Sequence, residues 1–151
     1  MQTNIKVRIG NDRDFEGIFL LIREFSIFQK TPEKLTISLE QMLAEKDLFQ
    51  CFVAETMDAE IVGFASFFFA YYSWSGKALY LDDLYVKENF RGQKIGGTLL
   101  NAVIDYAKKE NCKKLRWQVS GWNTNGIDFY KKIGAVIDGT EINCDLQLTS
   151  D

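Results

Sequence analysis

The stretch LYLDDLYVKENFRGQKIGG, Leu79 to Gly97, passes from a predicted strand through a glycine-rich segment into a predicted helix. Apolar residues at helical spacing, Ile95, Leu99, Val103 and Tyr106, mark the helix. The first turn of a helix carries unpaired N–H groups and the positive end of its dipole, and small residues let a phosphate approach them. The same glycines could instead serve a tight turn only, so the glycines alone leave phosphate binding open.

Two better-known phosphate motifs are absent from this stretch. The sequence contains no GxxxxGK followed by Ser or Thr, which excludes a P-loop nucleotide hydrolase. It also lacks GxGxxG with an acidic residue at the required distance, which excludes a Rossmann dinucleotide site. Any anion site here is therefore of another kind.

The strand before the glycines has an irregular apolar pattern. Leu79 and Leu81 stand at odd-numbered positions, whereas Leu84 and Val86 stand at even-numbered ones, so a regular strand would point the two pairs to opposite faces. An extra residue near Asp82–Val86, a β-bulge, would reconcile the two pairs. Alternatively both faces of a central strand are buried, and the parity then carries no information.

Asp82 and Asp83 are adjacent acids inside this apolar strand. Carboxylates are costly to bury unless they are paired or hydrogen-bonded, so one of them is expected to point into a solvated cleft. There it could act as a base or bind a cation. Without such a function, the two acids would be explained by a strand edge exposed to water or by a salt bridge to a lysine. The sequence leaves open which of the two aspartates faces the cleft.

Working outward, alternation and helical spacing predict the remaining elements. The predicted helices begin after Asp12 or Asp14, after Thr36 or Ser38, at Ile95 and at Asn123, the last ending at Ile133 before Gly134. The predicted strands are Ile5–Ile9, Phe49–Glu55, Ile61–Tyr72, Ala78–Val86, Lys113–Val119, Ala135–Ile137 and Ile142–Leu148. This order predicts an α/β (α+β) fold in a single domain, residues 1–151, with a mixed, mostly antiparallel central sheet of about 6–7 strands flanked by about four helices.

Composition narrows the chemistry. The chain has 151 residues, of which 46% are hydrophobic, and no histidine, which excludes Ser-His-Asp and Cys-His catalysis and His-rich zinc sites. The formal net charge of −3 disfavours a nucleic-acid partner.

Three scattered cysteines without CxxC predict reduced, buried thiols in a cytosolic protein. The start lacks an apolar signal-peptide core, and the longest apolar run is shorter than the ~20 residues that span a bilayer, so we expect a cytoplasmic chain without membrane or metal sites.

A further cluster runs from Trp122 to Gly134. Asn123 is a natural N-cap, and Phe129 and Ile133 are expected in the core. Tyr130, considered by itself, is more often a packing residue than a catalytic one.

The stretch from Ile61 to Val136 resembles the GNAT (Gcn5-related) N-acetyltransferases. RGQKIGG is similar to their acetyl-CoA pyrophosphate loop. The segments IVGFASFFFAYYSWSGK, LYLDDLYV and WNTNGIDFYKKIGA resemble the spermidine/spermine and thialysine N-acetyltransferase branch. The resemblance implies an enzyme, typically a homodimer, that moves the acetyl group of acetyl-CoA directly to the primary amine of a small cationic substrate: a diamine, a polyamine or a lysine/thialysine-like amino acid.

The resemblance also implies roles for individual residues. Tyr130 would protonate the departing thiolate, and Asp82 would take the proton of the amine through water. The implied cofactor-binding residues are Leu84, Tyr85, Val86, Arg91, Gly92, Gln93, Lys94, Ile95, Gly96, Gly97, Asn123 and Tyr130. The implied substrate-binding residues are Asp82, Phe28, Gln29 and Tyr72.

Departures from the family pattern refine the expectation. Lys94 replaces the first glycine of the family's GxG, and Asp82 replaces a glutamate. Gln29 and Tyr72 stand where polyamine-acetylating relatives carry acids, which favours a small monoamine, a diamine or a lysine-like amino acid over spermine. Two alternatives remain at this point: a CoA-binding regulatory module without catalysis, and a protein or peptide N-acetyltransferase.

Overall fold

The computed structural model describes residues 4–149, which divide after Trp117 into two compact units. We call them the sheet unit and the C-terminal unit. The strands of the sheet unit are β1 (Ile5–Ile9), β2 (Gln50–Thr56), β3 (Ile61–Tyr72), β4 (Gly76–Val86) and β5 (Lys114–Trp117). Its helices are α1 (Phe15–Phe28), α2 (Leu39–Ala44) and α3 (Ile95–Lys109), with short 3-10 turns at Asp12–Asp14, Pro32–Lys34, Lys46–Leu48 and Glu88–Phe90.

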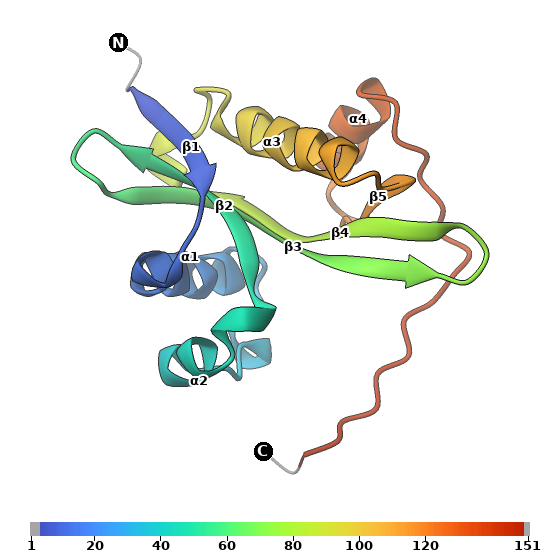
Figure 1. Cartoon of the computed structure of the whole chain (residues 1–151), viewed down its shortest axis with the longest axis horizontal. Helices are drawn as coiled ribbons and strands as arrows, with labels where there is room; N and C mark the ends of the chain where they lie inside the picture. Colours follow the sequence, from blue (N-terminus) through green and yellow to red (C-terminus); the bar gives the residue numbers. More distant parts are fainter. Residues whose placement is uncertain (1–3, 150–151) are drawn as a thin grey trace. The chain divides into compact units, whose positions relative to one another are not determined.

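The five strands form one sheet in the order β1-β2-β3-β4-β5. The first three pairings are antiparallel, and β4 pairs with β5 in parallel after the crossover through α3. Helices α1 and α2 lie against one face of the sheet and α3 against the other (Figure 1). The α/β class and the mixed, mostly antiparallel sheet are thereby confirmed.

The sheet has five strands rather than the predicted 6–7, because Ala135–Ile137 and Ile142–Leu148 are irregular. Their apolar residues alternate as in a strand, but alternation forms a strand only where a neighbouring strand supplies a ladder. Here Val136 is 92% and Leu148 87% exposed. The Thr140 N–H donates to the Asp138 carboxylate two residues away, and the Gln118 Nε2 donates to Asn143 Oδ1 at 3.0 Å; neither bond is part of a backbone ladder.

The core fills both faces of β3. Phe64 packs with Phe15, Ile18 and Tyr85 beneath α1. On the other face, Leu99 and its neighbours on α3 are fully buried. Gly63 allows this close approach, because a Cβ at that position would lie 3.2 Å from Leu99 Cδ1 and from the Tyr85 carbonyl oxygen.

The ends of the helices follow local rules with one correction. Asn11, rather than Asp12 or Asp14, caps the turn that leads into α1, and the Asp14 side chain completes a capping box by accepting from the Asn11 N–H. Ser38 accepts from the Gln41 N–H and caps α2, as predicted.

The C-terminal unit contains the helix α4 (Thr124–Lys132), with Asn123 Oδ1 accepting from the Gly126 N–H at 3.0 Å. Gly134 ends the helix at a φ of +98°, as predicted. Phe129 and Ile133 are exposed, which corrects the expectation that they lie in the core. No residue of α4 is buried in the described structure.

All three cysteines are free, but only Cys51 is buried. Burial raises the pKa of the Cys51 thiol to about 12, so it remains protonated. Cys112 is partly exposed and Cys144 is exposed, which corrects the expectation that all three thiols are buried. Residues 4–149 contain no helix that is long and apolar enough to cross a membrane.

Candidate functional site

A β-bulge interrupts β4 at Asp82. Asp83 pairs with Ser66, whereas Leu81 pairs with the next residue of β3, Phe67, so Asp82 is an extra residue without a partner in the register. The Asp83 N–H donates to the Ser66 hydroxyl at 3.2 Å. The bulge predicted from the parity of the leucines is therefore confirmed.

The two aspartates differ in their surroundings. Asp82 is exposed and Asp83 is only partly exposed. Burial raises the pKa of Asp83 to about 6, and the neighbouring Asp82 carboxylate contributes to the rise. Partial desolvation also raises the pKa of Asp82. The Asp83 carboxyl can therefore exchange a proton close to neutral pH.

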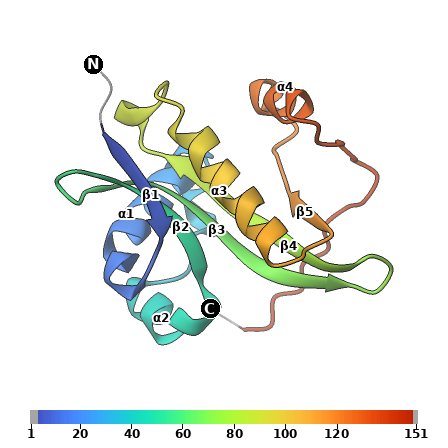
Figure 2. The same ribbon diagram turned by 45° about the horizontal axis from the view of Figure 1, so that its top comes forward.

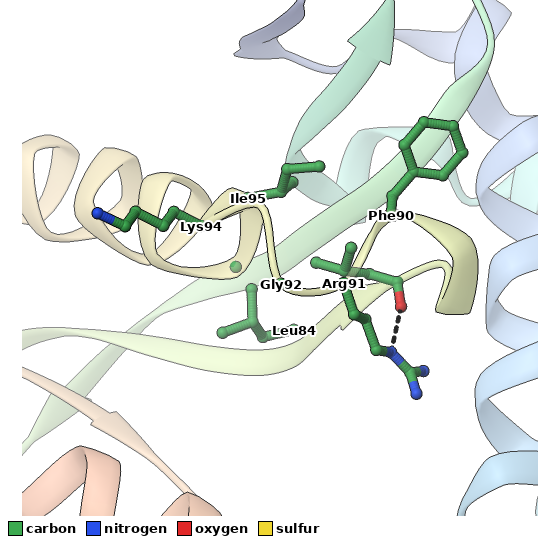
Figure 3. A pocket seen from close by; sticks show the side chains of 8 residues that line it. Leu84, Phe90, Arg91, Gly92, Lys94 and Ile95 are labelled. Atoms are coloured by element: carbon green, nitrogen blue, oxygen red, sulfur yellow. Dashed lines mark hydrogen bonds between the residues drawn. The ribbon is translucent and has the colours of Figure 1, made fainter. Parts of the chain in front are cut away.

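The bulge divides β4 into an outer half before Asp82 and an inner half after Asp83. A pocket of about 440 Å³ adjoins the inner half and the start of α3 (Figure 3). Its lining residues are Leu84, Val86, Phe90, Arg91, Gly92, Lys94, Ile95 and Gly96. No side chain caps α3, and Thr98 is the first residue whose N–H bonds back to the carbonyl of Lys94. The preceding N–H groups of the helix therefore remain available to an anion.

The backbone of the loop turns through two left-handed residues. Gly92 has a φ of +81°, which glycine adopts without cost. Lys94, at the N-cap of α3, has a φ of +65°, which a residue with a Cβ adopts only at a cost of about 1 kcal/mol. Figure 3 shows the Lys94 side chain extending away from Arg91. Lys94 thus contributes its backbone, rather than its ammonium group, to the centre of the loop.

Arg91 is held against the sheet. Its Nε donates to the Val86 carbonyl at 2.9 Å, the bond drawn in Figure 3. Its guanidinium carbon lies 4.7 Å from the centre of the Phe28 ring and 5.2 Å from that of Tyr85. These cation–π contacts leave the terminal nitrogens of Arg91 to hydrogen-bond a ligand.

The residues predicted for substrate binding lie in different places within the sheet unit. Phe28 packs against Arg91, and Gln29 is the C-cap of α1. Tyr72 lies at the outer end of β3, where Lys114 and Arg116 approach its ring. Phe28 therefore supports the loop, while Tyr72 belongs to a separate surface toward the tip of the β3–β4 hairpin, beyond Asp82 along the strands.

Asn123 and Tyr130 belong to the C-terminal unit. The Asn123 side chain caps α4, and the Tyr130 ring lies 5.6 Å from that of Phe129 in an edge-on arrangement. Burial raises the pKa of Tyr130. The phenol is accordingly protonated at neutral pH and can serve as a proton donor.

Several residues of the site were missed at the sequence level. Phe90 lines the pocket, and the Glu24 carboxylate accepts from the Tyr85 hydroxyl behind it. Lys114 and Arg116 alternate along β5 and so share one face. This alternation could have indicated a cationic surface, whereas no local signal marks Glu24 or Phe90.

Known proteins resemble this chain in sequence. Residues 15–135 match the model of the acetyltransferase (GNAT) family. A thialysine N-epsilon-acetyltransferase from Bos taurus is 34% identical over 142 residues, which cover 87% of this chain and 84% of that protein. An L-ornithine N5-acetyltransferase from Arabidopsis thaliana is 32% identical over 148 residues, covering 90% of this chain and 65% of that protein.

Solved structures agree on the architecture. The crystal structure of an aminoglycoside acetyltransferase from an uncultured soil metagenomic sample, in complex with trehalose, matches with a TM-score of 0.78. The match covers 96% of this chain and 97% of the other at 20% identity, so it establishes the fold alone.

Proposed function

Because this chain belongs to the GNAT family of N-acetyltransferases, we propose that it moves the acetyl group of acetyl-CoA directly to the side-chain amine of a small cationic substrate, foremost a lysine-like amino acid. The names of two relatives, an acetyltransferase for thialysine and one for ornithine, support an amino-acid acceptor. Gln29 and Tyr72, at positions where the resemblance to polyamine-acetylating relatives would expect acids, also favour it over a polyamine.

The observation that carries the proposal is the position of the bulge. Asp82 and Asp83 stand between the outer half of β4 and its inner half, where Leu84 and Val86 line the pocket beside the glycine-rich loop. A cationic amine bound by the carboxyl pair would therefore lie next to a thioester held along the inner half of the strand.

In the proposed cofactor site, the pyrophosphate lies at the N-terminus of α3. The backbone from Gly92 to Gly97, including Gln93, Lys94, Ile95 and Gly96, would donate N–H groups, and Arg91 would add charge. The backbone of Leu84, Tyr85 and Val86 would hold the pantetheine arm. One N–H of this segment would polarise the thioester carbonyl as negative charge develops on its oxygen. Asn123 would contribute a further cofactor contact.

Proton transfer sets the energetic task. A lysine-type ammonium has a pKa near 10.4, so deprotonating it at pH 7 costs about 4–5 kcal/mol. Asp82 would bind the ammonium and accept its proton through water, with Asp83 completing the acidic pair. The neutral nitrogen then attacks the thioester carbon, and the carbon–sulfur bond breaks. Tyr130 would donate its proton to the departing thiolate, and the proton that the nitrogen loses as the amide forms would restore the tyrosine hydroxyl.

The test is an assay of free thiol with acetyl-CoA and a panel of amino acids, diamines, polyamines and peptides. Acetyl-CoA-dependent thiol release with a lysine-like amino acid, matched by acetylated product in mass spectrometry, is the expected result. Cofactor binding without turnover on any acceptor would identify a regulatory module instead. Turnover on peptides alone would identify a protein acetyltransferase.

Three broader features belong to the same proposal. The family match runs from residue 15 to 135 and includes residues of both units, which supports one acetyltransferase domain over residues 1–151. A homodimer is expected from the resemblance, and a cytoplasmic location from the free cysteines. Analytical ultracentrifugation checks the dimer, and a species with the mass of one chain at micromolar concentration would contradict it.

A further inference from the structure

We propose that Arg116 and Lys114 form a receptor for the α-carboxylate of the acceptor, and that this receptor makes the enzyme select amino acids over the corresponding diamines. This inference rests on the proposed function and specifies its substrate class. It assigns residues outside the α3 pocket and outside the positions that the family resemblance implied.

The receptor is built from two cations around one aromatic ring. The Arg116 guanidinium carbon lies 4.5 Å from the centre of the Tyr72 ring, and the Lys114 ammonium nitrogen lies 4.8 Å from the same centre. Lys114 and Arg116 alternate along β5, so their side chains leave the sheet on one face. Tyr72 reaches them from the outer end of β3.

These cations lack a carboxylate partner in the described part of the chain. The ion pairs among residues 4–149 use the cations of Arg8, Lys46 and Lys87. The face of a tyrosine ring attracts a cation but supplies no acceptor for its N–H donors. Two like charges gathered at one ring gain most from an anion that accepts hydrogen bonds from both, and a carboxylate has two oxygens for this purpose.

The receptor shares its surroundings with the acid proposed to bind the amine. Tyr80 pairs with Arg116 across the β4–β5 ladder and precedes Asp82 by two positions. Burial raises the pKa of the Tyr80 phenol, the Asp82 carboxylate and Tyr72 raise it further, and the Arg116 guanidinium lowers it. Tyr80 is thus within electrostatic range of both the acid and the cation.

The order of these groups along β4 suits an extended molecule with an ammonium at one end and a carboxylate at the other. The backbone positions of Asp82 and Arg116, offset by two residues on neighbouring strands, lie about 8 Å apart given the strand spacing and rise, and the Arg116 guanidinium extends from there toward the Tyr72 ring, away from Asp82. An extended lysine side chain places its amine about 7 Å from its α-carboxylate. With the ammonium at Asp82, the carboxylate of such a molecule would extend along β4 toward Arg116.

The surface between the two groups is open and aromatic. Phe68 stacks on Tyr80 with ring centres 5.0 Å apart and is 45% exposed. The outer part of the β3–β4 hairpin extends beyond α1 in both views of the molecule (Figures 1 and 2). An aliphatic chain of a few methylenes can lie on these rings, with its amine at one end and its carboxylate at the other.

The same charges oppose other acceptors. A diamine presents a second ammonium where the amino acid presents its carboxylate, and Arg116 and Lys114 repel it. A polyamine adds further positive charge in this direction. The receptor therefore supplies both an attractive and a repulsive element, the combination that gives specificity.

The experiment compares acceptors that differ by the carboxylate alone: L-lysine with pentane-1,5-diamine, and L-ornithine with butane-1,4-diamine. We expect wild-type kcat/KM to favour each amino acid by about tenfold or more, the equivalent of one charge-assisted contact. Arg116→Gln should abolish this preference by raising KM for the amino acid, while kcat/KM for the diamine stays level or rises. Arg116→Lys should restore part of the preference.

Controls separate this result from general damage. Lys109→Gln removes an exposed charge from the last turn of α3 and should leave the preference unchanged. Equal use of lysine and pentane-1,5-diamine by wild type overturns the carboxylate receptor but leaves the proposed acetyltransferase function in place. The receptor is likewise overturned if Arg116→Gln folds and keeps the preference. If Arg116→Gln does not fold, the test rests on two measurements: the preference of wild type for lysine over pentane-1,5-diamine, and the loss of that preference in Lys114→Gln. A Lys114→Gln variant that keeps the preference would overturn the receptor. Failure to acetylate any amine overturns the proposed function and this inference with it.

Discussion

The hydroxyl of Tyr85 on β4 donates a hydrogen bond to the Glu24 carboxylate on α1, with 3.0 Å between the two oxygens. The Tyr85 ring also stacks on Phe25, with ring centres 4.9 Å apart, and lies beneath the guanidinium of Arg91. One side chain thereby connects the helix on one face of the sheet to the loop that begins α3.

Replacing Tyr85 by Phe removes the hydroxyl and keeps the ring. The free energy of unfolding should fall by about 1 kcal/mol, since the Glu24 carboxylate loses a protein donor. Urea unfolding monitored by tryptophan fluorescence measures the difference. Tyr71→Phe is the matched control, because the Tyr71 side chain is 80% exposed, and it should change stability little. An equal effect of both substitutions would contradict a stabilising role for the Tyr85–Glu24 bond.

Replacing Lys94 by Gly should stabilise the protein. Glycine adopts the left-handed conformation at this position without steric cost, so the free energy of unfolding should rise by about 0.5–1 kcal/mol relative to Lys94→Ala. The alanine variant removes the charge and keeps the Cβ, which separates strain from electrostatics. Equal stability of the two variants would show that Lys94 is unstrained. KM for acetyl-CoA should change less than threefold in either, because we propose that the loop binds through its backbone.

Replacing Asp83 by Asn should stabilise the protein at neutral pH. The fold raises the pKa of Asp83 to about 6, above that of the unfolded chain, so this group makes stability fall as pH rises from about 4 through 6. Asparagine never ionises, and at pH 7 the variant should gain about 2 kcal/mol. The gain should vanish near pH 4. Unfolding curves at both pH values test this, with the exposed Asp58→Asn as control; a gain that is independent of pH would contradict ionisation as its cause.

Replacing Asp82 by Asn should weaken the use of a cationic amine. The ammonium loses its counter-charge, so KM for the amine should rise by about tenfold. In wild type, kcat/KM should rise with pH through about 6 as Asp83 ionises and completes the acidic pair. The Asp82 charge contributes to the raised pKa of Asp83, so the acidic limb of the Asp82→Asn profile should move to lower pH. An unchanged KM and an unchanged limb would place the base elsewhere.

Replacing Tyr130 by Phe tests the proton donor. Loss of a general acid typically lowers a rate by about a hundredfold or more, so kcat should fall by that order while KM for acetyl-CoA changes less than threefold. Steady-state kinetics with saturating amine make the measurement. An unchanged kcat would remove Tyr130 from the chemistry, and a rise in KM alone would assign it to binding.

Local rules predicted much of the sheet unit. The apolar pattern, with Leu81 at an odd-numbered and Leu84 at an even-numbered position, indicated the bulge as one of two explanations, the other being a strand buried on both faces; the structure shows the bulge. Asn123 was predictable as a cap, and Ser38 as one of two candidates with Thr36, because a short side-chain oxygen reaches the first N–H groups of its own helix. Such features depend on a few neighbouring residues only.

Tertiary features were not predictable in this way. Tyr85 and Glu24 are 61 positions apart, and nothing in either neighbourhood signals the other. Arg91 was expected to face a phosphate, but its stacking on Phe28 depends on how α1 packs on the sheet. Ile142–Leu148 has the alternation of a strand, yet a strand also needs a partner, which no local pattern supplies.

The extra residue at Asp82 reverses, along β4, which positions point to which face of the sheet. Side chains before it and after it are fitted to the sheet independently, so Tyr80 and Tyr85 share a face although their separation has the wrong parity. Removing the insertion would restore an even ladder and turn the whole outer half by one residue, carrying Tyr80 to the face covered by α3. In the proposed site, the acceptor would lie on the outer half and acetyl-CoA along the inner half, so substitutions in the outer half would change the acceptor without altering the inner half. On this proposal, one strand would serve both a fixed acetyl donor and a changeable acceptor.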